Sequence, residues 1–151
     1  MKINNIEQIW TITCLNSSVD QTTNLISMFN IFDELKVDVN LEKEVDVVNV
    51  PIQFELITLW KKLSSNLEEN DEIQINLTDP VGKKISTFNY KLNIPKDKKR
   101  MRYRLVISGL SVTKNGTYVF SIHVKDIKTK EYKEVGNTTI DLFINRKIIK
   151  K

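Results

Sequence analysis

The stretch "DEIQINLTDPVGKKISTFNYKLNIP", residues 71–95, decides the fold class because it contains two strand patterns and the turn between them. Apolar residues occupy alternate positions on both sides of that turn: Ile73, Ile75, Leu77, Phe88, Tyr90, Leu92 and Ile94. Side chains two residues apart lie on the same face of a β-strand, so each half buries one face. The residues "DPVG" at 79–82 favour a tight turn. We therefore predict an antiparallel hairpin with one face in a core.

The stretch "TKNGTYVFSIHVKD", residues 113–126, follows the same rule after an Asn115-Gly116 pair. That pair can adopt the positive φ angles of a tight turn. Residues 101–107 upstream also alternate, with apolar residues on one face. We therefore predict that residues 101–107 and 118–124 pair as a second hairpin.

Further strands are predicted at residues 6–15 and 25–35, after Pro51, and at 138–145. The segments 41–48 and 61–70 could each form a short helical turn, but neither has a sustained helical pattern. About seven to nine strands with frequent turn signals predict an all-β fold. We expect an antiparallel β-sandwich, immunoglobulin-like or jelly-roll-like, with few or no helices; a flattened barrel has almost the same pattern.

Length and composition favour one globular domain over residues 1–151, with a short basic tail at 146–151. The chain has 40% hydrophobic and 28% charged residues. Polar residues interrupt its N-terminus where a signal peptide needs an apolar core, and no apolar run of membrane-spanning length occurs. A single cysteine fits a reducing compartment. We expect a cytosolic protein that does not bind membranes.

The sequence lacks the residues that several kinds of metal, nucleotide and catalytic site need. Cys14 and His123 are too few for a conventional zinc site, and no glycine-rich phosphate loop or GxSxG motif is present. The acidic segment "DVNLEKEVD" at 38–46 alternates oxygen ligands, but Lys43 occupies the position where a calcium loop needs glycine. Alternation places Cys14 on a buried strand face. We expect no catalytic residue, metal or cofactor.

A row of arginines is the most distinctive polar feature. Alternation places Arg100, Arg102 and Arg104 on one exposed strand face. If the three arginines neutralised three phosphates, the logarithm of the binding constant would change with the logarithm of the salt concentration with a slope of only about −2.7. This slope is too shallow for strong DNA binding by the arginines alone. The intervening Met101 and Tyr103 face away, so no aromatic platform for bases is expected within that strand. We predict an interaction surface among Arg100, Arg102, Arg104, Val119 and His123, with nucleic acid as the less favoured partner.

Three stretches, "CLNSSVDQTTNLISMFNIFDEL", "VPIQFELITLW" and "KNGTYVFSIHVKD", resemble a family of small, uncharacterised bacterial proteins with a β-sandwich domain. The resemblance is carried by Ser27, Phe29, Asn30 and Ile31, and by Gly116 and Tyr118. It implies a fold and a bacterial origin, and it transfers no catalytic residue. The Gly-x-Tyr strand is also similar to strands of immunoglobulin-like sandwiches, in which the tyrosine anchors a corner.

These observations favour a non-enzymatic module that binds another protein or itself through exposed strands. Its predicted signature is an exposed patch that includes Val119, Ile57 or Leu59. The alternative is a ligand-binding protein or an enzyme whose carboxylates and arginines meet only in the fold, for example Asp33, Glu55 and Arg104. The third hypothesis is nucleic-acid binding through the arginine row.

Overall fold

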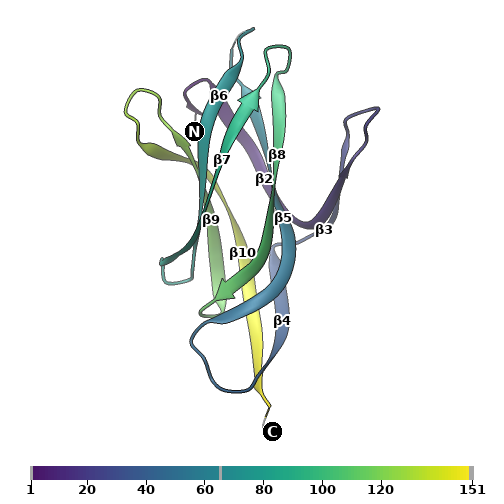
Figure 1. Cartoon of the computed structure of the whole chain (residues 1–151), viewed down its shortest axis with the longest axis vertical. Helices are drawn as coiled ribbons and strands as arrows, with labels where there is room; N and C mark the ends of the chain where they lie inside the picture. Colours follow the sequence, from purple (N-terminus) through teal and green to yellow (C-terminus); the bar gives the residue numbers. More distant parts are fainter. Residues whose placement is uncertain (1, 65, 150–151) are drawn as a thin grey trace.

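The computed structural model describes residues 2–64 and 66–149, and every regular element in those ranges is a strand (Figure 1). The strands are β1 (Lys2–Ile3), β2 (Ile6–Val19), β3 (Ile26–Ile31), β4 (Glu34–Leu41), β5 (Val48–Lys62), β6 (Glu69–Thr78), β7 (Lys84–Ile94), β8 (Arg100–Val112), β9 (Gly116–Lys125) and β10 (Tyr132–Ile148). The all-β prediction is confirmed. The possible helical turns at 41–48 and 61–70 were wrong for the described residues, and no described helix could cross a membrane.

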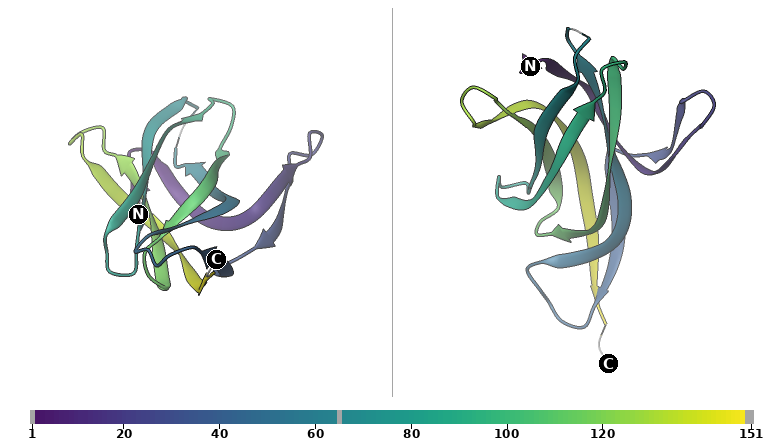
Figure 2. Two further views of the ribbon diagram at one scale, coloured as in Figure 1. Left: turned by 60° about the horizontal axis from the view of Figure 1, so that its bottom comes forward. Right: turned by 45° about the horizontal axis from the view of Figure 1, so that its top comes forward.

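Two curled sheets enclose a common hydrophobic core (Figure 2). Sheet A has the order β1-β2-β5-β8, and β3 pairs with β2 outside this path. Sheet B has the order β4-β10-β9-β6-β7. All pairs are antiparallel except β4 with β10, which run parallel. The described residues form ten strands rather than the expected seven to nine, partly because the predicted strand at 25–35 is divided into β3 and β4.

The predicted hairpin at residues 71–95 is confirmed as β6 and β7. Ile73 lies opposite Tyr90 and Ile75 opposite Phe88, so the apolar sets share the inner face. In the turn, Asp79 Oδ1 accepts hydrogen bonds from the backbone N–H groups of Val81 and Lys83 at 3.1 and 2.8 Å. These bonds fix the turn, and thereby the register of the two strands.

The predicted second hairpin is wrong. β8 pairs with β5 in sheet A, whereas β9 pairs with β6 and β10 in sheet B. The segment between β8 and β9 is therefore a crossing from one sheet to the other. Alternation shows which face of a strand is buried but not which strand lies beside it. The inner faces of β8 and β9 meet the same core from opposite sheets.

A tyrosine anchors this crossing. The buried Tyr118 hydroxyl donates to the carbonyl of Lys114 at 2.7 Å and accepts from the N–H of Thr113 at 3.0 Å. It thereby satisfies backbone groups where the chain leaves sheet A. Tyr118 therefore holds the chain at the point where it passes from β8 to β9.

Tyr118→Phe should lower the free energy of unfolding by about 1–2 kcal/mol, because the N–H groups of Thr113 and Lys114 and the carbonyl of Lys114 lose their partner while the ring remains packed. Urea denaturation monitored by circular dichroism would measure this change. Tyr132→Phe is the matched control, because the Tyr132 side chain is partly exposed on β10. A loss as small as that of the control would show that the corner bonds do not stabilise the fold.

The β2–β3 hairpin projects away from the two sheets (Figure 1). The first half of β2 pairs with β5 as far as Cys14 opposite Glu55, and its second half pairs with β3. The hairpin carries exposed apolar side chains: Leu15, Val19, Leu25, Phe29 and Ile31. After β3, the chain crosses to sheet B and begins β4 at Glu34.

At the C-terminus, β10 continues to Ile148 beside β4. Arg146 lies opposite Val39, and its guanidinium donates to the carbonyl of Val45 at 2.6 Å. Residues 146–148 of the predicted basic tail are therefore strand, and residues 150–151 lie outside the described residues.

Candidate functional site

The three arginines of β8 lie on the outer face of sheet A. In the register with β5, Arg100 is opposite Lys61, Arg102 opposite Leu59 and Arg104 opposite Ile57. The residues between them, including Tyr103, pack against the core instead. The three arginine side chains therefore point to the same outer face of sheet A, as alternation predicted.

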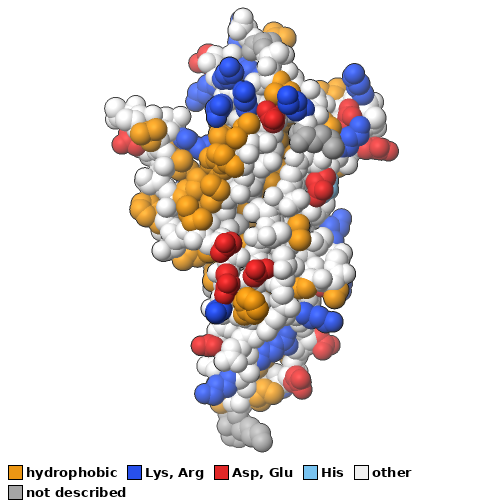
Figure 3. Space-filling view, turned by 180° about the vertical axis from the view of Figure 1, so that it is seen from behind, with side chains coloured by type: hydrophobic (Ala, Val, Ile, Leu, Met, Phe, Trp, Pro, Cys, Tyr) orange, Lys and Arg blue, Asp and Glu red, His pale blue; other side chains and the backbone are white. Residues whose placement is uncertain are grey.

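The β2–β3 hairpin and this row border an open hollow of about 490 Å³, which we call the arginine groove. Its lining comes from β2, the hairpin, β5, β8 and the loop before β8: Trp10, Val19, Asn24, Ile26, Ile57, Leu59, Lys98, Arg100, Met101, Arg102 and Arg104. In the view from behind, Lys and Arg side chains gather at the upper end of the molecule, and a hydrophobic patch lies directly below them (Figure 3). The groove thus combines apolar surface with several positive charges.

Two of the arginines are held by neighbouring groups. Arg102 Nη2 donates to the carbonyl oxygen of Asn24 and to its Oδ1, the latter at 3.2 Å. Arg104 Nη1 lies 3.5 Å from Glu55 Oε1 and 3.3 Å from Ser17 Oγ. Because the partners of Arg102 are neutral, they orient its guanidinium without cancelling its charge.

Cys14 lies beneath this ion pair and is fully buried, as the sequence predicted. Its Sγ is 3.9 Å from Glu55 Oε2. Burial raises the pKa of the Cys14 thiol, and the Glu55 charge raises it further. The thiolate is therefore disfavoured, which opposes nucleophilic chemistry at this position.

An aromatic side chain from another strand shares the arginine face, although Met101 and Tyr103 of β8 itself face the core as expected. Trp10 of β2 lies opposite Leu59 of β5, and Leu59 lies opposite Arg102. The aromatic comes from a strand two places away in the sheet. Alternation within β8 could not reveal it, because strand order is a long-range property.

The other predicted surface residues lie elsewhere. Val119 and His123 belong to β9 of sheet B, where they lie opposite Thr139 and Glu134. Both are partly buried, and within the described chain the inner ring nitrogen of His123, Nδ1, has no hydrogen-bond partner. The predicted five-residue surface is therefore split between the two sheets.

Two groupings predicted from the sequence, the exposed apolar patch and the carboxylate–arginine site, are also only partly formed. Ile57 is 0% exposed, so it cannot join an exposed patch with Val119. Glu55 and Arg104 do meet, but Asp33 lines a different hollow beside Thr138 and Thr139. The three-residue carboxylate–arginine site is therefore not assembled.

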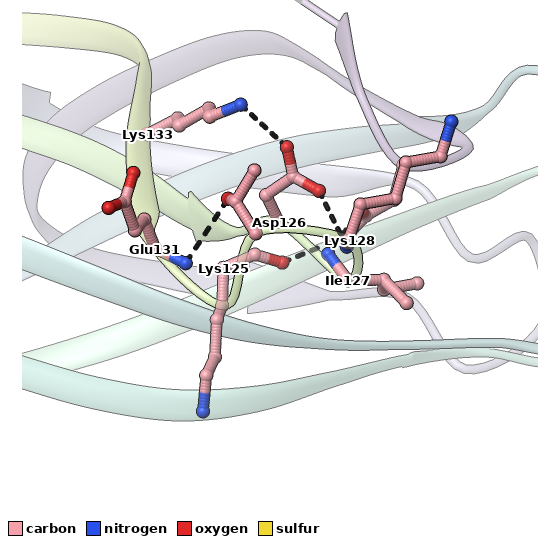
Figure 4. Close-up of polar contacts among 8 residues, drawn as sticks. Lys125, Asp126, Ile127, Lys128, Glu131 and Lys133 are labelled. Atoms are coloured by element: carbon pink, nitrogen blue, oxygen red, sulfur yellow. Dashed lines mark hydrogen bonds and ion pairs between the residues drawn. The ribbon is translucent and has the colours of Figure 1, made fainter.

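A smaller hollow, of about 230 Å³, lies between the start of β6 and the β9–β10 loop. Asn4 joins these elements: its Nδ2 donates to Asp71 Oδ1 at 2.6 Å, and its Oδ1 accepts from the N–H of Ile127 at 3.0 Å. Asp126 accepts from Lys133 Nζ at 2.6 Å and from the N–H of Lys128 at 2.8 Å (Figure 4). These bonds order the loop, which indicates a structural role.

Asp71 is the incompletely hydrogen-bonded member of this cluster. It is 6% exposed, and within the described chain its Oδ2 has no hydrogen-bond partner. Burial raises the pKa of its carboxyl above the ordinary range, against the hydrogen bond from Asn4, which lowers it. The charged form is therefore poorly stabilised in the native state.

Asp71→Asn should stabilise the protein at neutral pH. A raised native pKa means that the carboxyl favours folding when protonated, and that this contribution is lost as the pH rises through the native pKa. The gain from the neutral isostere should shrink as the pH falls below the ordinary aspartate range. Urea denaturation across this acidic range would test the sign.

Asp79→Asn is the matched comparison and should have the opposite sign. Burial acts to raise the pKa of Asp79, but hydrogen bonds from Lys83, Thr113 and Val81 lower it overall. Its contribution is therefore present above the ordinary pKa and lost as the pH falls through the native value. Equal responses of the two variants would contradict both assignments.

Among residues 2–64 and 66–149, no three Cys, His, Asp or Glu side chains are grouped to hold a metal ion. No curated protein matches the chain. Residues 42–133 match the model of a family of unknown function (DUF6941), which agrees with the expectation of an uncharacterised family. This match covers more than half of the chain and contains β5 to β9, including the arginine row. The chain belongs to this family of unknown function.

Proposed function

We propose that the protein is a non-enzymatic protein-binding module that uses the β2–β3 hairpin and the arginine groove beneath it. The observation that carries this proposal is the clustering of exposed apolar side chains on a projecting hairpin beside Lys98, Arg100 and Arg102, which have no carboxylate partner within the described chain. Such surfaces, apolar with a polar rim, are typical of protein interaction sites.

The apolar part of the surface is the hairpin itself. Leu25 is 68% exposed, Ile31 61% and Phe29 50%. Single exposed apolar residues are common on proteins, but here several lie on one hairpin that leaves the main sheets. A partner that covered them would remove apolar area from water, which is the general driving force of association.

The charged part is the basic wall of the groove. Within the described chain, Lys98, Arg100 and Arg102 form no ion pair, whereas Arg104 pairs with Glu55. Charges at the rim of an interface raise the association rate and select partners of opposite sign. We therefore propose a partner that presents negative charge to this wall.

The finer assignments made from sequence are part of this proposal. Two sheets around one core, joined by a tyrosine corner, support a single β-sandwich domain, immunoglobulin-like or jelly-roll-like. The single cysteine supports a cytosolic location, and the resemblance supports a bacterial origin.

Site-specific photo-cross-linking in cells that express the chain would test the proposal. A photoreactive residue at Phe29 should form specific cross-links to another polypeptide, identified by mass spectrometry. The control position is Val81, which is 65% exposed on the β6–β7 turn and does not line the groove. Light scattering of the purified chain would show whether the polypeptide is a second copy.

Identical cross-links from Phe29 and Val81, or none from Phe29, would overturn the proposal. A cross-link that disappears when Ile31→Ser is added would support it, because Ile31 belongs to the same exposed set. The circular dichroism spectrum of this variant should match that of the unaltered chain, because Ile31 is outside the core.

A second candidate is binding of single-stranded nucleic acid, which Trp10 favours. An aromatic ring beside a row of arginines can stack a base while the guanidinium groups contact phosphates. A fluorescently labelled oligothymidylate would test this by anisotropy. Binding that weakens steeply with salt and requires Trp10 would favour nucleic acid over protein.

A further inference from the structure

β8 is an edge strand with two dissimilar faces. Among the described strands it pairs with β5 alone, and its 13 residues from Arg100 to Val112 form the border of sheet A (Figure 1). Its backbone N–H and C=O groups on the other side are therefore available to a further strand. The outer face carries the arginine row. The inner face carries Met101, Tyr103 and Leu105, which are only partly buried.

The edge strands of sheet B, β4 and β7, lack this combination of faces. In β4, Lys36 lies 3.3 Å from Glu34, so charges of both signs alternate on the outer row and compensate each other. The outer row of β7 includes the neutral Thr87 and Asn89, which bond to neighbouring Asn76 and Gln74. Of these three edge strands, β8 alone carries three charges of one sign at alternate positions.

We propose that β8 accepts an added strand from the partner protein, and that acidic and apolar residues alternate in this strand. The inference rests on the proposed protein-binding function and specifies its recognition mode. Alternate side chains of an added strand have the same spacing as the arginines, about 6.6–6.8 Å. One set would meet the arginine row, and the other would cover the partly buried inner row.

Two of the three arginines, Arg102 and Arg104, are already oriented by neighbouring groups. Asn24 fixes Arg102, while Glu55 and Ser17 fix Arg104. Less side-chain freedom is then lost on binding, and the guanidinium of Arg102, which has no carboxylate partner in the described chain, can pair with a carboxylate of the added strand. The groove beside the row provides the space for the acidic side chains.

The probe is a short synthetic peptide in which glutamate alternates with valine, measured by isothermal titration calorimetry against the full chain. A peptide of the same composition with its glutamates adjacent is the sequence control. Two further peptides carry N-methyl groups on alternate backbone amides, in the two possible registers. Strand addition uses the N–H groups of one register only, so one methylated peptide should bind and the other should lose about tenfold or more.

Charge reversal tests the arginine row. Arg100→Glu, Arg102→Glu and Arg104→Glu together should weaken binding about tenfold or more, because three charge pairs become repulsive. The control variant carries Lys83→Glu, Lys84→Glu and Lys128→Glu, which change the net charge equally at exposed positions outside the groove. It should bind as the unaltered chain does.

Each of these measurements can contradict the proposal that β8 accepts an added strand. No binding of the alternating peptide, equal binding of both methylated peptides, or equal losses in the two charge-reversal variants would overturn it. Tighter binding of oligothymidylate than of the peptide, lost with the arginines, would assign the row to nucleic acid instead. The proposed protein-binding function would survive a failed peptide test if the cross-link from Phe29 persisted, so the two failures are distinguishable.

Discussion

Trp60→Ala should lower the free energy of unfolding by about 3–5 kcal/mol, the range typical of emptying a large aromatic site in a core. Trp60 is the largest of the fully buried side chains in the described chain. Its Nε1 donates to the hydroxyl of Tyr90 at 3.1 Å. The substitution therefore removes packing and also leaves a buried hydroxyl without this donor.

The effect should be large because Trp60 connects both sheets. Trp60 belongs to β5 of sheet A and Tyr90 to β7 of sheet B. The Tyr90 ring stacks on Tyr103 of β8, with 3.6 Å between centroids and an angle of 4° between the rings. The cluster thus joins edge strands that have no backbone pairing with each other.

Guanidinium denaturation followed by circular dichroism would measure the loss. Trp60→Phe should fall between the unaltered chain and Trp60→Ala, since it keeps a ring but removes the donor. Trp10→Ala is the matched control, because Trp10 lies on the outer face and is only partly buried. Equal losses for Trp10→Ala and Trp60→Ala would contradict the assignment of Trp60 as the central core residue.

The sequence predicted local strand structure well because alternation acts within each strand. Ile73, Ile75 and Leu77 all lie in the core, as their spacing required. The pairing of β8 with β9 could not be predicted in the same way. Both strands bury alternate side chains in one core, and this pattern is identical whether they are neighbours in a sheet or face each other across it.

The candidate site was predicted only in part for the same reason. The common face of the arginines follows from positions 100, 102 and 104 in one strand. The arrival of Trp10 at that face depends on strand order, and the cover by Asn24 depends on the bend of the hairpin. Ile31 and Phe29 were expected in an ordinary strand, yet they are exposed because the hairpin leaves the core. These apolar side chains, exposed to solvent on the hairpin, mark the proposed binding surface.

Lys62→Met should destabilise the protein by about 3 kcal/mol or more, because three carbonyl groups lose a charged donor. Lys62 is 3% exposed at the end of β5. Its Nζ donates to the carbonyls of Leu67, Pro95 and Lys96 at 2.8, 3.0 and 3.3 Å. An ammonium group with three donors satisfies this arrangement, whereas a methionine of similar length supplies none.

Lys62 also determines how β8 begins. It holds the β7–β8 loop by its side chain, and its backbone N–H donates to the carbonyl of Lys99 at 2.9 Å, one residue before the arginine row. Lys62→Met should therefore accelerate amide hydrogen exchange at residues 96–100 more than elsewhere, besides lowering the urea midpoint. Lys61→Met, whose side chain lies on the outer face opposite Arg100, should change stability by no more than about 0.5 kcal/mol. If both variants were equally stable and exchange in the loop were unchanged, Lys62 would not be the anchor that presents the arginine row.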